Sequence, residues 1–139
     1  MKPKLISGNH HKDQRGIVSF NNDFDLTQIK RMYIIENSNI DIVRAWQGHK
    51  IEQRWFTAVE GKFRIQLIQV DNWDHPNSNL PKIEFIIQSE TLDTLHIPGG
   101  YISSIQSLKE KSKLIAMTDY HLGEIDDEYK YTTNYFTKK

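Results

Sequence analysis

Short runs of alternating apolar and polar residues recur along most of the chain, and no segment keeps a helical period for more than two turns. Alternation with a period of two places every second side chain on the same face of a strand, so each run predicts a half-buried strand. The runs span residues 16–20, 29–35, 42–47, 55–59, 62–70, 81–87, 94–97, 102–106 and 113–118. So many short strands in one chain predict an all-β sandwich or barrel.

Turn residues separate these predicted strands. Gly61 lies between two long β runs, and a glycine there supplies the positive φ of a tight hairpin. Residues 71–80, DNWDHPNSNL, are typical of a surface loop. The tail, residues 119–139, carries too many aromatic side chains for a disordered end. We therefore expect the tail to pack back, either on its own barrel or on a partner.

Length and composition limit the number of domains, the partners and the chemistry that the chain can have. The 139 residues suit a single domain, residues 1–139. Because 18 basic residues balance 18 acidic ones, we expect neither nucleic acid nor an anionic membrane as a partner. The chain has no cysteine, which excludes disulfides, thiolate metal ligands and a cysteine nucleophile. It starts without the apolar stretch of a signal peptide, so we expect a cytoplasmic protein.

Four motifs follow one another along most of the chain: DQRG at 13–16, RAWQGHK at 44–50, a hairpin pattern over 53–71, and LHIPGGY at 95–101. In this order and spacing they resemble the superfamily of dTDP-4-keto-6-deoxysugar 3,5-epimerases and 3,4-ketoisomerases. The match is nearest to its WxcM-like sugar epimerases. No motif is specific by itself, but four in register are.

This resemblance implies a specific fold, assembly and substrate, whereas the strand pattern alone indicates only the all-β class. It implies a cupin jelly roll, which is a double-stranded β-helix, in a single domain. It also implies a homodimer in which an N-terminal strand crosses to the partner, and a nucleotide-sugar substrate bound in the mouth of the barrel. The activity implied is epimerisation or keto migration on a dTDP-linked 4-keto-6-deoxyhexose.

The metal ligands of other cupins are largely absent. Those proteins present two histidines as H-x-H, then a carboxylate, then a third histidine after a P-x-G corner. The corresponding positions here hold Gln47, His49, either Gln53 or Arg54, and Ser103. Since glutamine and serine are weak ligands and an arginine repels a cation, we expect no metal and no other cofactor.

Proton transfer beside a carbonyl needs a base, a donor for the enolate oxygen and cations for the pyrophosphate. His49 is the candidate base, because imidazole titrates near neutrality. Gln47 shares its strand face and is expected to bind a sugar hydroxyl or carbonyl. Tyr101 is the candidate acid or enolate donor, with Tyr120 and Tyr129 as alternatives that spacing does not separate.

Phosphate binding is expected from Arg44, Lys50 and Arg54, which cluster in one short stretch. The resemblance adds Arg15, which matches an arginine that contacts the nucleotide. Trp46 is a candidate stacking platform, and Ser103 stands where relatives often have histidine.

Simpler interpretations stay open for these residues. Arg44 and Arg54 are equally consistent with charged edge strands that prevent aggregation, and Trp46 with a core or interface anchor. His49 by itself is consistent with a half-exposed residue at a strand end.

Three hypotheses for the function follow. The first is a metal-free isomerase that uses His49 as its base. The second is a catalytically impaired nucleotide-sugar-binding cupin with a binding or scaffold role, because the 3,5-epimerases have their base where this chain has Gln47 and an amide cannot accept that proton. The third is a metal-dependent cupin dioxygenase or phosphosugar isomerase, which elemental analysis would identify.

Overall fold

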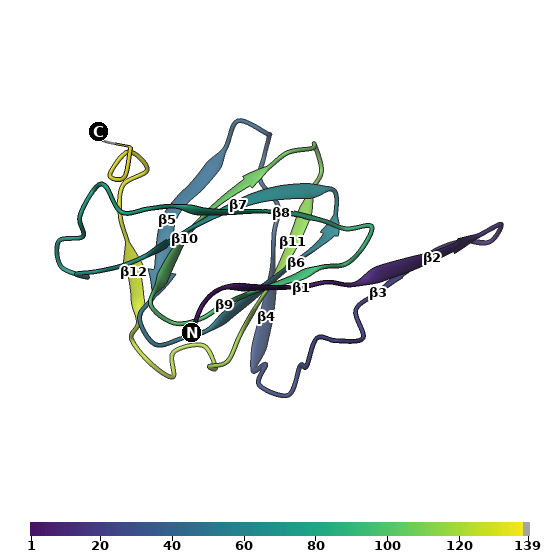
Figure 1. The fold of residues 1–139 in the computed structure, drawn as a ribbon, viewed down its shortest axis with the longest axis horizontal. Coiled ribbons are helices and arrows are strands. Elements are labelled where there is room, and N and C mark those ends of the chain that lie inside the picture. The colour runs from purple at the N-terminus through teal and green to yellow at the C-terminus, as the bar shows by residue number, and fades with distance from the viewer. Residues whose placement is uncertain (138–139) are drawn as a thin grey trace.

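The computed structural model describes residues 1–137, and its regular structure in that range consists of β-strands (Figure 1). No helix in this range is long and apolar enough to cross a membrane. The strands are β1 (Lys4–Ile6), β2 (Asn9–Asp13), β3 (Gly16–Phe20), β4 (Arg31–Ile35), β5 (Val43–His49), β6 (Arg54–Glu60), β7 (Lys62–Gln69), β8 (Ile83–Gln88), β9 (Thr94–Ile97), β10 (Tyr101–Ser107), β11 (Lys113–Thr118) and β12 (Glu128–Lys130).

The strands form two five-stranded antiparallel sheets and one separate hairpin. One sheet has the order β1-β9-β6-β11-β4, the other has the order β12-β5-β10-β7-β8, and β2 pairs only with β3. Several neighbours within a sheet are far apart in sequence, so the chain crosses repeatedly from one sheet to the other. This arrangement confirms the all-β prediction and is that of a jelly roll.

The inner faces of the two sheets enclose an apolar core. Phe56 on β6, Phe63 and Leu67 on β7, and Leu95 on β9 are all fully buried in it. Their strands alternate, so each inward side chain is followed by one that points outward. This packing joins the two sheets on the side of β7 and β8.

All nine predicted strands are present, with ends that differ by at most two residues from the predicted ones. The hairpin at Gly61 is confirmed: its φ is 76°, and a Cβ atom there would lie 2.0 Å from Ser112 Oγ. The sequence analysis did not predict β1, β2 and β12. These strands are short or polar on both faces, so they lack the alternation that marks the others.

The C-terminal tail packs on its own barrel. β12 extends the second sheet beside β5, with Tyr129 opposite Gly48 (Figure 1). Phe136 is buried against Trp46, their ring centroids 5.5 Å apart in an edge-to-face arrangement. The Tyr131 hydroxyl donates a hydrogen bond of 2.6 Å to the backbone oxygen of Trp73. The predicted packing of the tail is therefore seen up to residue 137, and residues 138–139 lie outside the described range.

The N-terminal segment has two parts. β1 pairs with β9 of the same chain, whereas the β2–β3 hairpin projects away from the two sheets (Figure 1). The exchange of an N-terminal strand between two copies stays a prediction.

Candidate functional site

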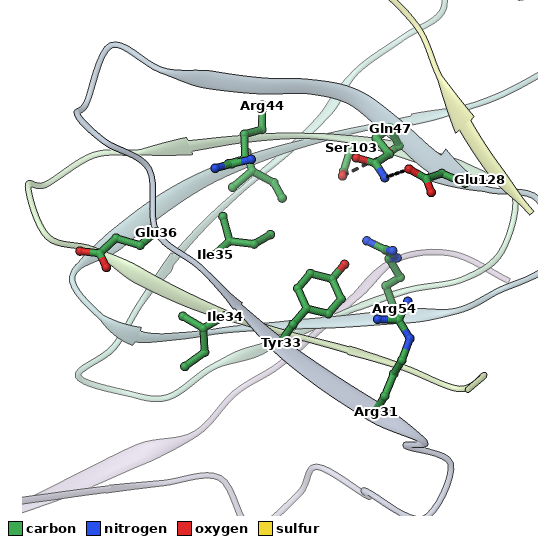
Figure 2. Close-up of a pocket in the computed structure, with 11 residues that line it drawn as sticks. Arg31, Tyr33, Ile34, Ile35, Glu36, Arg44, Gln47, Arg54, Ser103 and Glu128 are labelled. Atoms are coloured by element: carbon green, nitrogen blue, oxygen red, sulfur yellow. Dashed lines mark hydrogen bonds between the residues drawn. The ribbon is translucent and has the colours of Figure 1, made fainter. Parts of the chain in front are cut away.

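The two sheets separate on the side of β4, β5 and β12 and enclose a cavity of about 620 Å³ (Figure 2). Its wall carries three arginines, Arg31 on β4, Arg44 on β5 and Arg54 on β6, together with polar side chains of β5, β10 and β12. A smaller cavity of about 240 Å³ shares Arg31 and Glu128 with it. These two residues therefore form the boundary between the two spaces.

Strand alternation on β4 supplies one wall. Arg31, Tyr33 and Ile35 line the larger cavity, while Met32 between them is 71% exposed on the outer face. The hydroxyl of Tyr33 points into the cavity (Figure 2). The guanidinium carbons of Arg31 and Arg54 lie 5.3 and 5.8 Å from the centre of the Tyr33 ring, within the range of cation–π attraction. The two charges are thus held close together at the cavity floor.

β5 supplies the opposite wall. Gln47 and His49 point inward and pair across to Ser103 and Tyr101 of β10, which confirms that the two side chains share a face. Between them lies Gly48, where a Cβ atom would stand only 2.1 Å from the backbone oxygen of Tyr101. Only glycine allows this close approach, which brings the Gln47 and His49 positions against β10.

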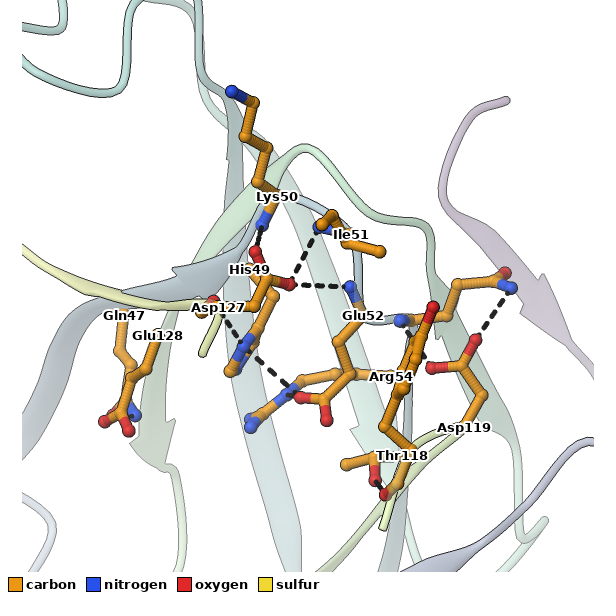
Figure 3. A network of polar contacts seen from close by, with 12 residues as sticks. Gln47, His49, Lys50, Ile51, Glu52, Arg54, Thr118, Asp119, Asp127 and Glu128 are labelled. Carbon is orange, nitrogen blue, oxygen red and sulfur yellow. Dashed lines mark hydrogen bonds and ion pairs between the residues drawn. The ribbon is translucent and has the colours of Figure 1, made fainter. Parts of the chain in front are cut away.

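His49 is buried, with 6% of its surface exposed, and lines the smaller cavity (Figure 3). Its Nδ1 lies 3.0 Å from the backbone oxygen of Asp127 and 3.2 Å from Glu52 Oε2. A carbonyl oxygen only accepts, so Nδ1 carries the proton in the neutral ring and Nε2 carries the lone pair. Within residues 1–137 this buried Nε2 has no hydrogen-bond partner.

The surroundings keep this imidazole uncharged. Burial lowers the pKa of His49 to about 4, and the nearby charge of Arg54 acts in the same direction, against the opposing effects of Asp127 and Glu128. Burial also raises the pKa of Glu52, whereas Arg54, with its Nε 3.6 Å from Glu52 Oε2, opposes that shift. At neutral pH the site therefore presents a free lone pair on His49 Nε2.

The Asp127 carboxylate holds the turn between β5 and β6. It accepts three backbone hydrogen bonds, from Lys50 at 3.1 Å, Ile51 at 2.8 Å and Glu52 at 2.8 Å (Figure 3). Its own backbone oxygen orients the ring of His49. One residue of the tail thus fixes both the turn and the imidazole, although the two segments are more than 70 residues apart in sequence.

Gln47 is held from two sides. Its Nε2 donates to Glu128 Oε1 at 2.6 Å, and its backbone oxygen accepts from Ser103 Oγ at 3.3 Å (Figure 2). The donor end of the amide is therefore engaged by a carboxylate from the tail, a partner that the sequence analysis did not predict.

Five predicted site residues do come together around the two cavities: Gln47, His49, Arg44, Arg54 and Ser103. Arg44 donates from Nε to Asn37 Oδ1 at 2.7 Å, which steadies its guanidinium at the outer end of the larger cavity. The site also contains residues that the sequence analysis did not single out: Arg31, Tyr33, Glu52, Asp127 and Glu128.

Two predicted site residues lie among buried side chains. Tyr101 is buried in the apolar core and is not among the residues that line the two cavities, and burial raises its pKa; its role as an acid or enolate donor stays a prediction. Trp46 lies on the outer face of β5, since side chains alternate along a strand, and packs against Phe136. It anchors the tail and does not wall the cavity.

Two predicted phosphate ligands also lie apart from these two cavities. Arg15 sits in the turn of the β2–β3 hairpin, where its side chain is 86% exposed and its Nη2 lies 2.8 Å from Asp13 Oδ2. Lys50 follows the last residue of β5, and its amine points away from His49 and Glu52 (Figure 3). Of the three cations that cluster in sequence, Arg44 and Arg54 line the larger cavity, whereas Lys50 lies in the turn after β5 and points away from His49.

Among the described residues, no group of three histidine, aspartate or glutamate side chains is placed to hold a metal ion. Metal content itself is a matter for elemental analysis of the purified protein, for which we expect less than one ion per chain.

Known proteins share this fold. No protein-family model and no curated protein matches the chain. A 3,4-ketoisomerase from Helicobacter canadensis superposes with a TM-score of 0.71 at 18% identity, over 99% of this chain and 96% of that one. A mutant 3,4-ketoisomerase from Thermoanaerobacterium thermosaccharolyticum, in complex with TDP-4-keto-6-deoxyglucose, gives 0.69 at 19% identity, over 98% and 92%.

A dTDP-4-dehydrorhamnose 3,5-epimerase from Bacillus anthracis, with TDP and PPi bound, gives a TM-score of 0.75 at 12% identity, over 95% of this chain and 79% of that one. At such identities the likeness concerns the fold. The cupin jelly roll predicted from the sequence motifs is therefore confirmed: this chain has the architecture of the dTDP-sugar epimerases and ketoisomerases.

Proposed function

We propose that this protein is an isomerase, an epimerase or ketoisomerase, that acts on a nucleotide-linked 4-keto-6-deoxyhexose by metal-free proton transfer. The observation that carries the proposal is the buried His49, whose Nε2 lone pair is free beside an arginine-lined cavity. The solved structures with this fold support it: two are 3,4-ketoisomerases, one of them in complex with TDP-4-keto-6-deoxyglucose, and a third is a dTDP-4-dehydrorhamnose 3,5-epimerase.

The chemistry follows from the groups around the cavity. His49 Nε2 takes the acidic proton beside the sugar carbonyl, and the bond electrons move onto the carbonyl oxygen as an enolate. Tyr33 and Arg54, which line the larger cavity, offer hydrogen-bond donors for that oxygen. Arg31 and Arg44 supply the planar forks that suit phosphate oxygens.

Gln47 has a supporting part in this scheme. An amide does not accept the substrate proton, and here its donor end is bound to Glu128. Its oxygen remains to accept a hydrogen bond from a sugar hydroxyl, as the sequence analysis expected.

Deuterium wash-in tests the proposal. The protein is incubated with dTDP-4-keto-6-deoxyglucose in deuterated water, and the sugar is followed by NMR. Exchange at C3 alone supports keto migration or 3-epimerisation, and exchange at C3 and C5 supports double epimerisation. If no position exchanges, the proposal fails and a binding or scaffold role takes its place.

We also propose that the protein works as a homodimer in the cytoplasm. The outer face of β4 exposes Met32 and Ile34, and the projecting hairpin exposes Ile17 and Val18, apolar side chains that a second copy would cover. The absence of cysteine fits a reducing compartment. Light scattering should give twice the mass of the chain, and Met32→Glu should shift it to the monomer; a monomeric wild type would contradict the dimer.

A further inference from the structure

The candidate base His49 does not line the larger cavity. Gln47 faces this cavity with an amide, while His49 lines only the smaller one. Two carboxylates reach the larger cavity, Glu36 and Glu128. Figure 2 shows the Glu36 carboxylate turned outward at the far end, whereas Glu128 lies directly beside Gln47. Among the tail residues up to 137, Glu128 is therefore the one acid–base group that borders both spaces.

We propose that the Glu128 carboxylate is a second proton-transfer group, which moves a proton between the two oxygens of the substrate during keto migration. This inference rests on the proposed function and commits it to the ketoisomerase reaction. It adds Glu128, a residue of the tail, to the residues that contact the substrate.

The position of Glu128 is built by the fold. It is the first residue of β12 and stands opposite His49 in the strand pairing, so the two side chains enter the site from neighbouring strands. Oε1 accepts from Gln47 Nε2 at 2.6 Å and lies 3.3 Å from Lys130 Nζ. Both polar contacts within residues 1–137 use Oε1, which leaves Oε2 to meet a substrate. The side chain is 50% exposed, so a ligand in the cavity can reach it.

The proton steps balance. His49 takes the proton from C3, and the electrons of that bond form a C3–C4 double bond while the carbonyl electrons move onto O4. Glu128 takes the hydroxyl proton from O3 and delivers it to O4. The electrons left on O3 form the new carbonyl at C3, and C4 takes the proton back from His49. Both residues end in their starting protonation states.

In this scheme His49 forms the enolate and Glu128 moves the hydroxyl proton. The variant Glu128→Gln should therefore change the rate of deuterium exchange and the rate of product formation differently. Because His49 still forms the enolate, deuterium exchange at C3 should continue within about tenfold of wild type. Formation of the 3-keto product should fall by about 100-fold or more, the usual contribution of a proton-transfer group. The matched control is Glu124→Gln on the same tail, whose carboxylate binds only the backbone of His121 in the described structure and should change neither rate.

A second variant, Glu128→His, distinguishes proton transfer from a merely structural role. Imidazole can carry the proton in place of the carboxylate, so product formation should return in part, which a merely structural role of Glu128 would not produce. This result is available even if the amide variant loosens β12, which thermal melting would reveal.

Each outcome is decisive. If wild type exchanges C3 but yields no 3-keto product, or if Glu128→Gln forms product at the wild-type rate, the inference about Glu128 is overturned while the proposed isomerase class stands. If wild type shows no exchange, the proposed function fails and the inference falls with it. Continued exchange with lost product in Glu128→Gln supports both.

Discussion

The two sides of the barrel differ in what lies between the sheets: apolar side chains on one side and a polar cavity on the other. On the side of β7, β8 and β9 the sheets meet through fully buried apolar side chains such as Phe63, Leu67 and Leu95. On the side of β4, β5 and β12 they stand apart and enclose ionisable groups that need polar partners when they are buried, among them His49 and Glu52. The comparison indicates that one side supplies the stability with which the other holds its polar site together.

The largest effect is expected on the closed side. Phe63→Ala removes a fully buried ring between the sheets and should lower the free energy of unfolding by about 3–5 kcal/mol, from lost burial and the cavity left behind. Urea denaturation measures it. Since Phe63 lines neither cavity, the folded fraction should keep its C3 exchange. A loss below about 1 kcal/mol would show that the two sides share the stability evenly.

A slightly smaller effect is expected where the tail holds the open side. Asp127→Ala leaves three backbone N–H groups of the β5–β6 turn without their acceptor and should cost about 3 kcal/mol of unfolding free energy. C3 exchange should fall as well, because the ring of His49 loses its orientation. Asp126→Ala, an exposed neighbour, is the control and should cost less than about 0.5 kcal/mol. Equal effects of the two variants would refute the role given to Asp127.

The stability that the open side contributes should depend on pH, because two of its buried groups have shifted pKa values. The pKa of His49 is lowered to about 4 from an ordinary 6.5, so the folded protein binds fewer protons than the unfolded chain between these values. The stability is fully present above pH 6.5 and is lost as the pH falls toward 4, by up to about 3 kcal/mol. The raised pKa of Glu52 acts with the opposite sign and reduces the slope.

Urea midpoints measured between pH 7 and pH 4 check this expectation. The slope should flatten in His49→Asn, which has no titrating ring on the open side. An unchanged slope in this variant would assign the acid sensitivity to other groups.

The smallest effect concerns the two faces of β5. Trp46→Phe keeps an aromatic ring against Phe136 and should cost only about 1–2 kcal/mol. Because Trp46 points away from the cavity, the dissociation constant for TDP should stay within about twofold of wild type. Isothermal titration calorimetry measures it, and a large loss of affinity would return Trp46 to the binding site.

Strand alternation made much of the fold predictable. The inward positions of Gln47 and His49 follow from their spacing of two residues, and the hairpin at Gly61 follows from glycine's access to positive φ. The same rule, applied to Arg31, Tyr33 and Ile35, would have placed Tyr33 in the site. That signal was present in the sequence but was not used.

Other parts of the site have no local signal. Asp127 and Glu128 reach β5 from a tail more than 70 residues away, and their strand, β12, is too short and polar to show a pattern of its own. Arg15 and Lys50 were grouped with the other cations by sequence proximity or by resemblance, although the fold carries their side chains elsewhere. Long-range pairing decides such positions, and a single sequence does not contain it in readable form.

The central claim is that the buried ring of His49 accepts the substrate proton. Deuterium wash-in at C3 of dTDP-4-keto-6-deoxyglucose, compared between wild type, His49→Asn and the exposed-loop control His75→Asn, tests it most directly. The account predicts exchange by wild type and His75→Asn and a loss of about 100-fold or more in folded His49→Asn. Undiminished exchange in His49→Asn would contradict it.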